Sequence, residues 1–293
     1  MHCTVRWVIA AVVVTFSAPA EMLERCLASV RASEGVDHIV VVDTGGRARP
    51  VGAEIELIRV ENRGYGAAAN VGFDAARRAG ADLIALLNDD VVVASDWIRP
   101  LAAEFGDARV GAAQPMLLSA GLDRVNSLGV SVGADGAGTD VGAGERPPSE
   151  PSVRDLELFT GGAVLFSAAF LAATGGFDER YFLYYEDVDL ARRGAALGWT
   201  YRLVTSSVVE HLGGLSTGSD PDRTRFFQER NRLWASFRFA DPATMARAVW
   251  LSVRRLRHEP VGVHGRALVS GIAGAPRRLI ERAQARRVRR AHS

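Results

Sequence analysis

From Val8 to Met116 the sequence alternates between short apolar runs and longer amphipathic stretches. The runs are rich in Val and Ile, as in strands buried on both faces, and the stretches repeat apolar residues at helical spacing. Strands are expected at Val8–Val14, His38–Val42, Ile55–Val60, Leu83–Leu87 and Val110–Met116, and helices at Glu21–Arg31, Gly66–Ala79 and Asp96–Phe105. This alternation predicts an α/β fold with a mainly parallel sheet.

The first apolar run has a second interpretation. Trp7–Phe16 follows Arg6 and precedes a stretch of small residues, which is also the pattern of a signal peptide. We favour a strand, because the alternation that follows needs a first strand. No later apolar run reaches the roughly 18 residues that a membrane-spanning helix requires.

Beyond Met116 the pattern becomes less regular. Residues 119–152 are rich in Gly, Asp, Pro and Ser and predict a long surface excursion with a hairpin near Val130 and Val132. Further strands are expected at Phe159–Ser167, Tyr201–Val204 and Val208–His211, and further helices at Phe170–Thr174, from Glu186, from Asp222, at Ala243–Arg257 and at Arg266–Arg289, the last with a break at Pro276. The Gly161-Gly162 pair would let a ligand approach the backbone closely.

The charge of the chain is unevenly distributed. The net charge is +1, but the twelve Arg and three acidic residues from Asp241 onward give +9 there and −8 before it. We therefore expect a domain at 1–240, with parts at about 1–118 and 155–240, and a basic helical extension at 241–293. An anionic membrane surface is the favoured partner of the extension. Nucleic acid is a weaker explanation, because no aromatic stacking platform accompanies the arginines.

One side of the expected helix at Ala243–Arg257 carries Met245, Val249, Ser252 and Leu256, with arginines around it. This pattern fits a membrane-surface helix, and it fits equally well an ordinary packed helix with one solvated face.

Ligands of open α/β sheets bind at the carboxyl ends of the strands. Polar residues follow the expected strands at Thr15 and Ser17, at Asp43 and Thr44, at Asn62 and Arg63, and at Asn88, Asp89 and Asp90. Asp89 and Asp90 could bind Mg²⁺ or Mn²⁺ together with the phosphates of a substrate. The same pair could simply begin a loop or cap the next helix. His211, at a late strand end, is one more candidate ligand, although a lone histidine is more often structural.

The segment Gly64–Ala69 fits the pattern G-x-G-x-x-A between a strand and a helix, as in dinucleotide-binding proteins. In those proteins the motif follows the first strand, whereas here it follows the third. The glycines are better explained by a backbone that comes close to a ligand.

The segment Gly175–Trp199 holds the densest group of candidate functional residues. An aromatic run from Tyr181 to Tyr185 leads into the carboxylates Glu186, Asp187 and Asp189 at an expected helix start. Acidic residues favour a helix N-terminus on electrostatic grounds alone. Together with the aromatic run they also describe a pocket wall that presents a carboxylate to a ligand.

The two cysteines, Cys3 and Cys26, imply neither a disulfide framework nor a structural zinc site. A reducing, cytosolic setting fits this composition.

An ordered series of segments resembles glycosyltransferase family 2, whose members are inverting enzymes of GT-A fold. The segments are VVVTFSAPAEMLERCLASV, IVVVDTGG, ENRGYGAAANVGF, LLNDDVVV, GGAVLFS, GGFDERYFLYYEDVDLARR and EHLGGLST, and together they span about residues 8 to 238. Within the family, the sequence is most similar to actinobacterial rhamnosyltransferases that use dTDP-rhamnose and a polyprenyl-diphosphate-linked acceptor. The family usually has Asn at Thr44 and Ser at Gly46.

The resemblance implies a role for each matching residue. Asp187 would be the general base, with Glu186, Asp189 and Tyr184 supporting it or contacting the acceptor. Asp90 would bind Mg²⁺ or Mn²⁺ with help from Asp89 and His211. The nucleotide would be bound by Thr15, Ser17, Asp43, Asn62, Arg63 and Gly66, with Asn70 steadying the loop.

The resemblance also implies the partners and the place of action. These are a nucleotide-diphosphate sugar, a glycan or lipid-linked acceptor, and the cytoplasm or the inner face of the membrane. Two alternatives remain: a nucleotide-sugar-binding protein without transferase activity, and a dinucleotide-dependent oxidoreductase.

Overall fold

The computed structural model describes residues 6–49, 52–213, 220–257 and 260–291. Cys3 and the end of the EHLGGLST segment therefore lie outside the described residues. The first part of the chain alternates strands and helices as the sequence predicts. Its elements are β1 (Ile9–Thr15), α1 (Ala20–Arg31), β2 (His38–Asp43), β3 (Ile55–Arg59), α2 (Tyr65–Arg78), β4 (Leu83–Asn88), β5 (Val91–Val93), α3 (Ile98–Ala103) and β6 (Val110–Ser119).

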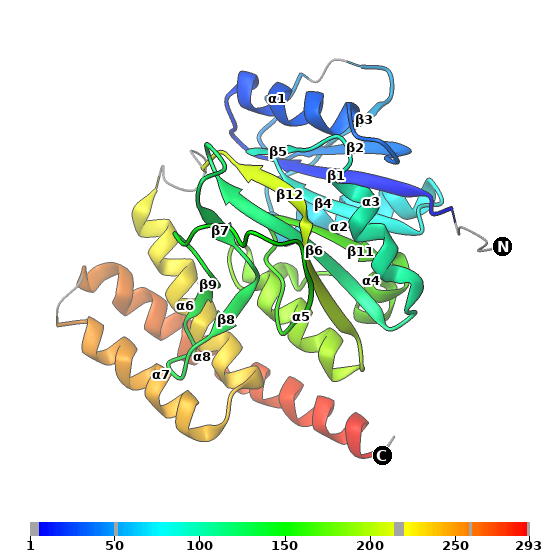
Figure 1. Cartoon of the computed structure of the whole chain (residues 1–293). Helices are drawn as coiled ribbons and strands as arrows, with labels where there is room; N and C mark the ends of the chain where they lie inside the picture. Colours follow the sequence, from blue (N-terminus) through cyan, green and yellow to red (C-terminus); the bar gives the residue numbers. More distant parts are fainter. Residues whose placement is uncertain (1–5, 50–51, 214–219, 258–259, 292–293) are drawn as a thin grey trace.

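A single large sheet forms the centre of this part (Figure 1). Its strand order is β10-β12-β6-β11-β4-β1-β2-β3, where β10 is Val153–Leu156, β11 is Ala163–Ser167 and β12 is Thr200–His211. Strands β4, β1, β2 and β3 run parallel, and β11 is antiparallel to both of its neighbours. The predicted α/β fold with a mainly parallel, mixed sheet is thus confirmed.

Strand β1 shows why both faces of the sheet are covered. All of its residues are buried, and successive side chains point to opposite faces. Ile9, Ala11 and Val13 belong to a core shared with α1 and α3, whereas Ala10, Val12 and Val14 belong to a core shared with α2, α4 (Ala168–Thr174) and α5 (Glu186–Ala196). The N-terminal apolar run is therefore a central strand, as we favoured from its sequence.

Two strands differ from the expectation. The strands expected at Tyr201–Val204 and Val208–His211 form one continuous strand, β12, whose register against β6 shifts between Val204 and Val208. Such a bulge absorbs extra residues without ending the strand. The strand expected at Phe159–Ser167 begins only at Ala163, so Gly161 and Gly162 lie in the loop before it.

The excursion at 119–152 folds back onto the molecule. It contains β7 (Val125–Ser127), which pairs with β6, and a hairpin of β8 (Val130–Val132) and β9 (Gly138–Asp140). The hydroxyl of Tyr185 accepts a hydrogen bond from Gly138 N and donates one to Gly136 O. The expected hairpin therefore exists and is attached to the aromatic run.

Three helices end the chain and lie together on one side of the molecule (Figure 1). They are α6 (Pro221–Phe239), α7 (Pro242–Arg255) and α8 (Val261–Ala291). Asp220 and Asp241 cap the first two, each followed by a proline in the first turn. Within the described residues, no helix is both long enough and apolar enough to span a bilayer.

The expected break at Pro276 is wrong, because α8 is helical on both sides of it. A proline inside a helix removes the hydrogen bond to the carbonyl four residues earlier. That residue is Ile272, which is 44% exposed, so this part of the helix lies open to solvent.

Candidate active site

A cavity of about 650 Å³ opens at the carboxyl ends of β1 and β4. The β8–β9 hairpin, the loop before α5 and the first turns of α6 form its other walls. Its lining includes these residues expected from the sequence: Asn62, Asp89, Asp90, Tyr184, Glu186, Asp187 and His211. Segments far apart in the sequence thus meet at one concave site, as parallel-sheet topology predicts.

Asp187 lies in the first turn of α5 with its carboxylate fixed by backbone donors. Its Oδ2 accepts a 2.9 Å hydrogen bond from Gly161 N, and its Oδ1 accepts one of 2.7 Å from Val188 N. Burial raises the pKa of Asp187 above its ordinary value, while these donors oppose the rise. The result is an oriented carboxylate of increased basicity facing the cavity, as a general base requires.

Glu186 precedes Asp187 on the same helix and is more deeply buried. Burial raises the pKa of Glu186, and the charge of Asp187 raises it further. Its Oε2 is buried without a hydrogen-bond partner. Of the two neighbours, Glu186 is therefore the one whose protonated form burial favours more strongly.

The loop before α5 has an unusual backbone. Phe182, Tyr184 and Tyr185 have φ angles of 67°, 68° and 68°, a region that side chains other than glycine rarely occupy. Residues held there cost about 1–3 kcal/mol each and need support from their surroundings. Asn231 of α6, which is fully buried, donates to the carbonyl oxygens of Tyr181, Leu183 and Tyr184.

Asp90 and His211 lie close together in the wall of the same cavity. Asp90 Oδ1 lies 3.2 Å from His211 Nε2, within ion-pair distance but without hydrogen-bond geometry, and His211 Nδ1 lies 3.1 Å from Asn126 Oδ1. Burial would lower the pKa of His211, but the adjacent Asp90 carboxylate raises it. Asn88 Oδ1 is also buried there without a partner.

The side chains of Asp90, His211 and Asn88 are the candidates for the protein ligands of a metal site. Among the described residues no cluster of three or more His, Cys, Asp or Glu side chains could hold an ion. One carboxylate, one imidazole and an unsatisfied amide oxygen nevertheless fit Mg²⁺ or Mn²⁺, which take part of their ligands from substrate phosphates and water.

Asp89 is buried beside this pair and faces the end of β1. Burial raises the pKa of Asp89 to about 6, while hydrogen bonds from the Thr15 side chain and from the Phe16 backbone oppose the rise. Thr15 thus acts on Asp89 and does not itself line the cavity.

The other predicted site residues lie behind or beside the cavity. Asp43, 1% exposed, accepts hydrogen bonds from the backbone of Gly45, Gly46 and Ala48 and so shapes the loop after β2. Its neighbour Thr44 lines the cavity instead, and Ser17 does not. Asp43 was expected to bind the nucleotide, but its carboxylate instead holds the loop after β2 in place.

In the segment after β3, too, one predicted residue lies at the cavity and its neighbour does not. Asn62 Oδ1 accepts from Gly64 N at the cavity, whereas Arg63 points away and pairs with Glu179 at 2.9 Å. Gly66 lies where a Cβ would approach Phe177 to 2.9 Å. Asn70 bonds to both the N–H and the carbonyl of Phe177, so it steadies the loop before α5.

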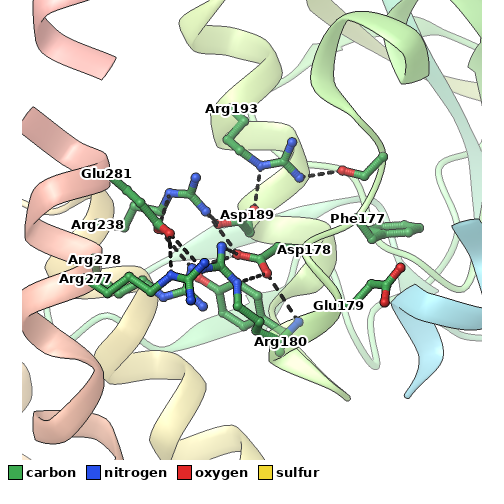
Figure 2. A network of polar contacts seen from close by, with 12 residues as sticks. Phe177, Asp178, Glu179, Arg180, Asp189, Arg193, Arg238, Arg277, Arg278 and Glu281 are labelled. Atoms are coloured by element: carbon green, nitrogen blue, oxygen red, sulfur yellow. Dashed lines mark hydrogen bonds and ion pairs between the residues drawn. The ribbon is translucent and has the colours of Figure 1, made fainter. Parts of the chain in front are cut away.

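Asp189 belongs to a buried ionic network and not to the cavity (Figure 2). It is fully buried and pairs with Arg193 at 2.6 Å and Arg238 at 2.5 Å. Arg278 of α8, 2% exposed, pairs with Asp178 at 2.7 Å and lies with its guanidinium carbon 4.7 Å from the Tyr181 ring centroid. The network therefore connects α8 to the loop before α5, which precedes Asp187. This connection crosses the domain boundary expected at residue 240.

Several cavity residues were not expected from the sequence. Tyr65 donates to Gly161 O, and Asn126 and Asp140 come from the excursion. The wall formed by the last helices adds Arg223, Glu229, Arg232 and Arg255 from α6 and α7. Nothing in the spacing of these residues marks them, because only the folding of the hairpin and the last helices brings them to the site.

Comparisons with known proteins agree with this geometry. The family model for glycosyl transferase family 2 matches residues 10–127. The N-acetylglucosaminyl-diphospho-decaprenol L-rhamnosyltransferase of two Mycobacterium tuberculosis strains is 44% identical over 72 residues, which is 25% of this chain and 24% of the relative. The match thus spans about a quarter of the length of these curated relatives.

Two solved structures share the fold at low sequence identity. A crystal structure of GalNAc-T7 with UDP, GalNAc and Mn²⁺ has a TM-score of 0.66 at 14% identity and covers 87% of this chain and 52% of that one. The mannosyltransferase PcManGT from Pyrobaculum calidifontis, in complex with GDP-Man and Mn²⁺, has a TM-score of 0.53 at 14% identity and covers 96% and 86%.

The sheet, its two helical layers and the cavity at the strand ends define a GT-A glycosyltransferase fold. Within that class, residues 10–127 match the family model for glycosyl transferase family 2.

Proposed function

We propose that this protein is an inverting glycosyltransferase that moves a sugar from a nucleotide-diphosphate donor to an acceptor hydroxyl. The observation that carries the proposal is the position of Asp187, held by Gly161 N and Val188 N at the wall of a cavity that also contains the Asp90–His211 pair. A base and a candidate diphosphate site in one cavity are the two requirements of direct transfer.

In the proposed reaction, Asp187 accepts the proton of the acceptor hydroxyl as its oxygen attacks the anomeric carbon. The bond between that carbon and the donor diphosphate breaks, and the diphosphate leaves with the bonding electrons. Direct attack inverts the anomeric centre and needs no covalent intermediate. Burial raises the pKa of Glu186, which favours its neutral form and so limits the negative charge beside the leaving diphosphate.

Asp90 and His211 would hold Mg²⁺ or Mn²⁺, with the buried Asn88 oxygen beside them. The ion would supply positive charge that stabilises the departing diphosphate. The presence of Mn²⁺ in the GalNAc-T7 and PcManGT structures supports this use of the site.

L-rhamnose from dTDP-rhamnose is the favoured donor, and a lipid-linked glycan is the favoured acceptor. The support is the 72-residue match to a rhamnosyltransferase whose name includes a decaprenol-linked acceptor. Such an acceptor would place the enzyme at the inner face of the membrane.

The experiment is a panel of nucleotide sugars, assayed with and without Mg²⁺ or Mn²⁺ for release of nucleoside diphosphate. A donor that is turned over is then tested with lipid-diphosphate glycans, and the anomeric configuration of the product is determined by NMR. Cation-dependent transfer with inversion is expected. Binding of donors without turnover would show a nucleotide-sugar-binding protein, and retention of configuration would exclude the proposed mechanism.

A further inference from the structure

Helix α8 exposes a stripe of large apolar side chains along one side. The members of the stripe are Val261, Val269, Ile272, Leu279 and Ile280, which are between 42% and 70% exposed. Their spacing places them on one helical face. Contiguous exposed apolar surface of this kind marks an interaction site more often than single exposed residues do.

The opposite side of α8 already packs against the protein. Val263 and Ala267 are buried there, and Gly271 lies so close to α6 that a Cβ would come within 2.5 Å of Leu233 Cδ1. Arg278 on the same side enters the ionic network (Figure 2). The exposed stripe is therefore a second apolar face that α8 does not need for its packing.

Basic residues accompany the stripe, and carboxylates do not. Arg266 and Arg277 are exposed on α8. Within residues 261–285 the single acid, Glu281, pairs with Arg180, Arg238 and Arg278 of the buried network, and also with Arg277 at 3.2 Å. Helix α7 has the same composition on its exposed side, where Arg254 lies 5.3 Å from the ring centroid of the exposed Trp250.

We propose that the exposed stripe of α8 docks on a bilayer surface rich in anionic lipid. Its apolar side chains would enter the boundary between headgroups and acyl chains, while the arginines contact lipid phosphates. A second copy of the chain fits this face less well, because pairing two such faces would bring arginines together without carboxylates between them.

This face differs from the one that the sequence indicated on α7. Met245 and Val249 pack against the core between the last helices, and Ser252 is 1% exposed and bonded to Glu229 and Arg232. Binding to a bilayer does not depend on the proposed transfer reaction. It would nevertheless suit that reaction, because α7, which carries Trp250, also contributes Arg255 to the cavity.

The test is flotation of the full chain with vesicles, without nucleotide or divalent cation. Removing residues after Ala240 is unsuitable, because Arg278 and Glu281 belong to the buried network. The double substitution Ile272→Glu and Leu279→Glu alters the stripe. Val153→Glu with Leu197→Glu is the matched control, because these side chains are 51% and 53% exposed on the α/β part.

We expect the wild-type chain to float with vesicles of phosphatidylglycerol and phosphatidylcholine but not with phosphatidylcholine alone. The stripe variant should bind the anionic vesicles at least about tenfold more weakly, and the control should bind as the wild type does. Thermal unfolding of both variants checks that they are folded.

Failure of the wild-type chain to float with anionic vesicles, or equal binding by the folded stripe variant, would overturn the proposal. So would a dimer in sedimentation equilibrium that the stripe variant abolishes, since the stripe would then join two copies. Donor turnover measured without vesicles reports separately on the proposed function.

Discussion

The side-chain amide of Asn231 donates a 2.8 Å hydrogen bond to the carbonyl oxygen of Tyr184, whose φ is 68°. The same amide donates to Leu183 O and Tyr181 O. One fully buried side chain therefore stabilises the strained turn that ends two residues before Asp187. Accurate placement of a base matters because small displacements strongly reduce catalysis.

Replacing Asn231 with Ala should lower the free energy of unfolding by about 2–4 kcal/mol, because the carbonyls of Leu183 and Tyr184 lose the hydrogen bond from Asn231. The kcat should fall more than donor affinity, since Asp187 loses its fixed position. Denaturant unfolding and steady-state kinetics measure the two effects. Ser236→Ala is the control, because Ser236 is buried on the same helix and its hydroxyl donates to Arg232 O. Unchanged kcat in folded Asn231→Ala would contradict the role of Asn231.

Asp187→Asn should reduce transfer by about 10²–10⁴-fold while donor affinity stays nearly unchanged, because an amide cannot accept the proton. Titration calorimetry with donor and turnover assays separate the two quantities. Asp189→Asn, two residues along, should act differently. It leaves Arg193 and Arg238 without their shared buried carboxylate and should mainly lower stability. Near-wild-type turnover by Asp187→Asn would remove Asp187 from its proposed role.

The pH dependence of kcat/KM should show an acid limb above the ordinary range of an aspartate. The base must be ionised to accept a proton, and burial raises the pKa of Asp187, so activity rises as pH increases through that raised value. Initial rates across pH at saturating cation measure it. An acid limb at or below about pH 4 would show that the group responsible is not a buried carboxylate.

Asp89→Asn should stabilise the free protein at neutral pH. The pKa of Asp89 is raised to about 6, so the folded state holds a proton that the unfolded state releases near pH 4. The wild-type protein therefore loses stability as pH rises from about 4 to 6, by up to about 2–3 kcal/mol for this group. Thermal or denaturant unfolding at several pH values measures the change. The slope in this interval should be smaller in the variant, and an unchanged slope would be inconsistent with a buried, protonated Asp89.

His211→Ala and Asp90→Ala should each raise the cation concentration needed for half-maximal turnover by at least about tenfold, since each removes one proposed ligand. Turnover titrated with Mn²⁺ measures this effect. Asn126→Ala should cause a smaller shift, because Asn126 is not a proposed ligand and contacts the other ring nitrogen of His211, Nδ1. Equal cation requirements in the wild type and both ligand variants would place the ion elsewhere.

The local pattern of the sequence was sufficient to predict the central α/β fold. Val8–Val14 and the later apolar runs have the composition of strands in a parallel sheet, and the helices between them have regular periodicity. As a result, β1 to β4 and α1 to α2 lie within a residue or two of their expected positions. The strand-end position of Asp89 and Asp90 and the helix-start position of Glu186 and Asp187 were also evident, because both follow from local structure alone.

The tertiary structure decided which polar residues face the cavity. Asp187 and Asp189 have equal standing in the sequence, yet helical rotation turns one to the cavity and the other to Arg238. Likewise, the carboxylate of Asp43 accepts hydrogen bonds from its own loop and does not face the cavity. Asn126 reaches His211 only because the excursion at 119–152 folds back. Burial and hydrogen-bond partners depend on contacts between distant segments, which local periodicity does not encode; the same contacts turn Arg278 inward and leave the apolar stripe of α8 facing outward.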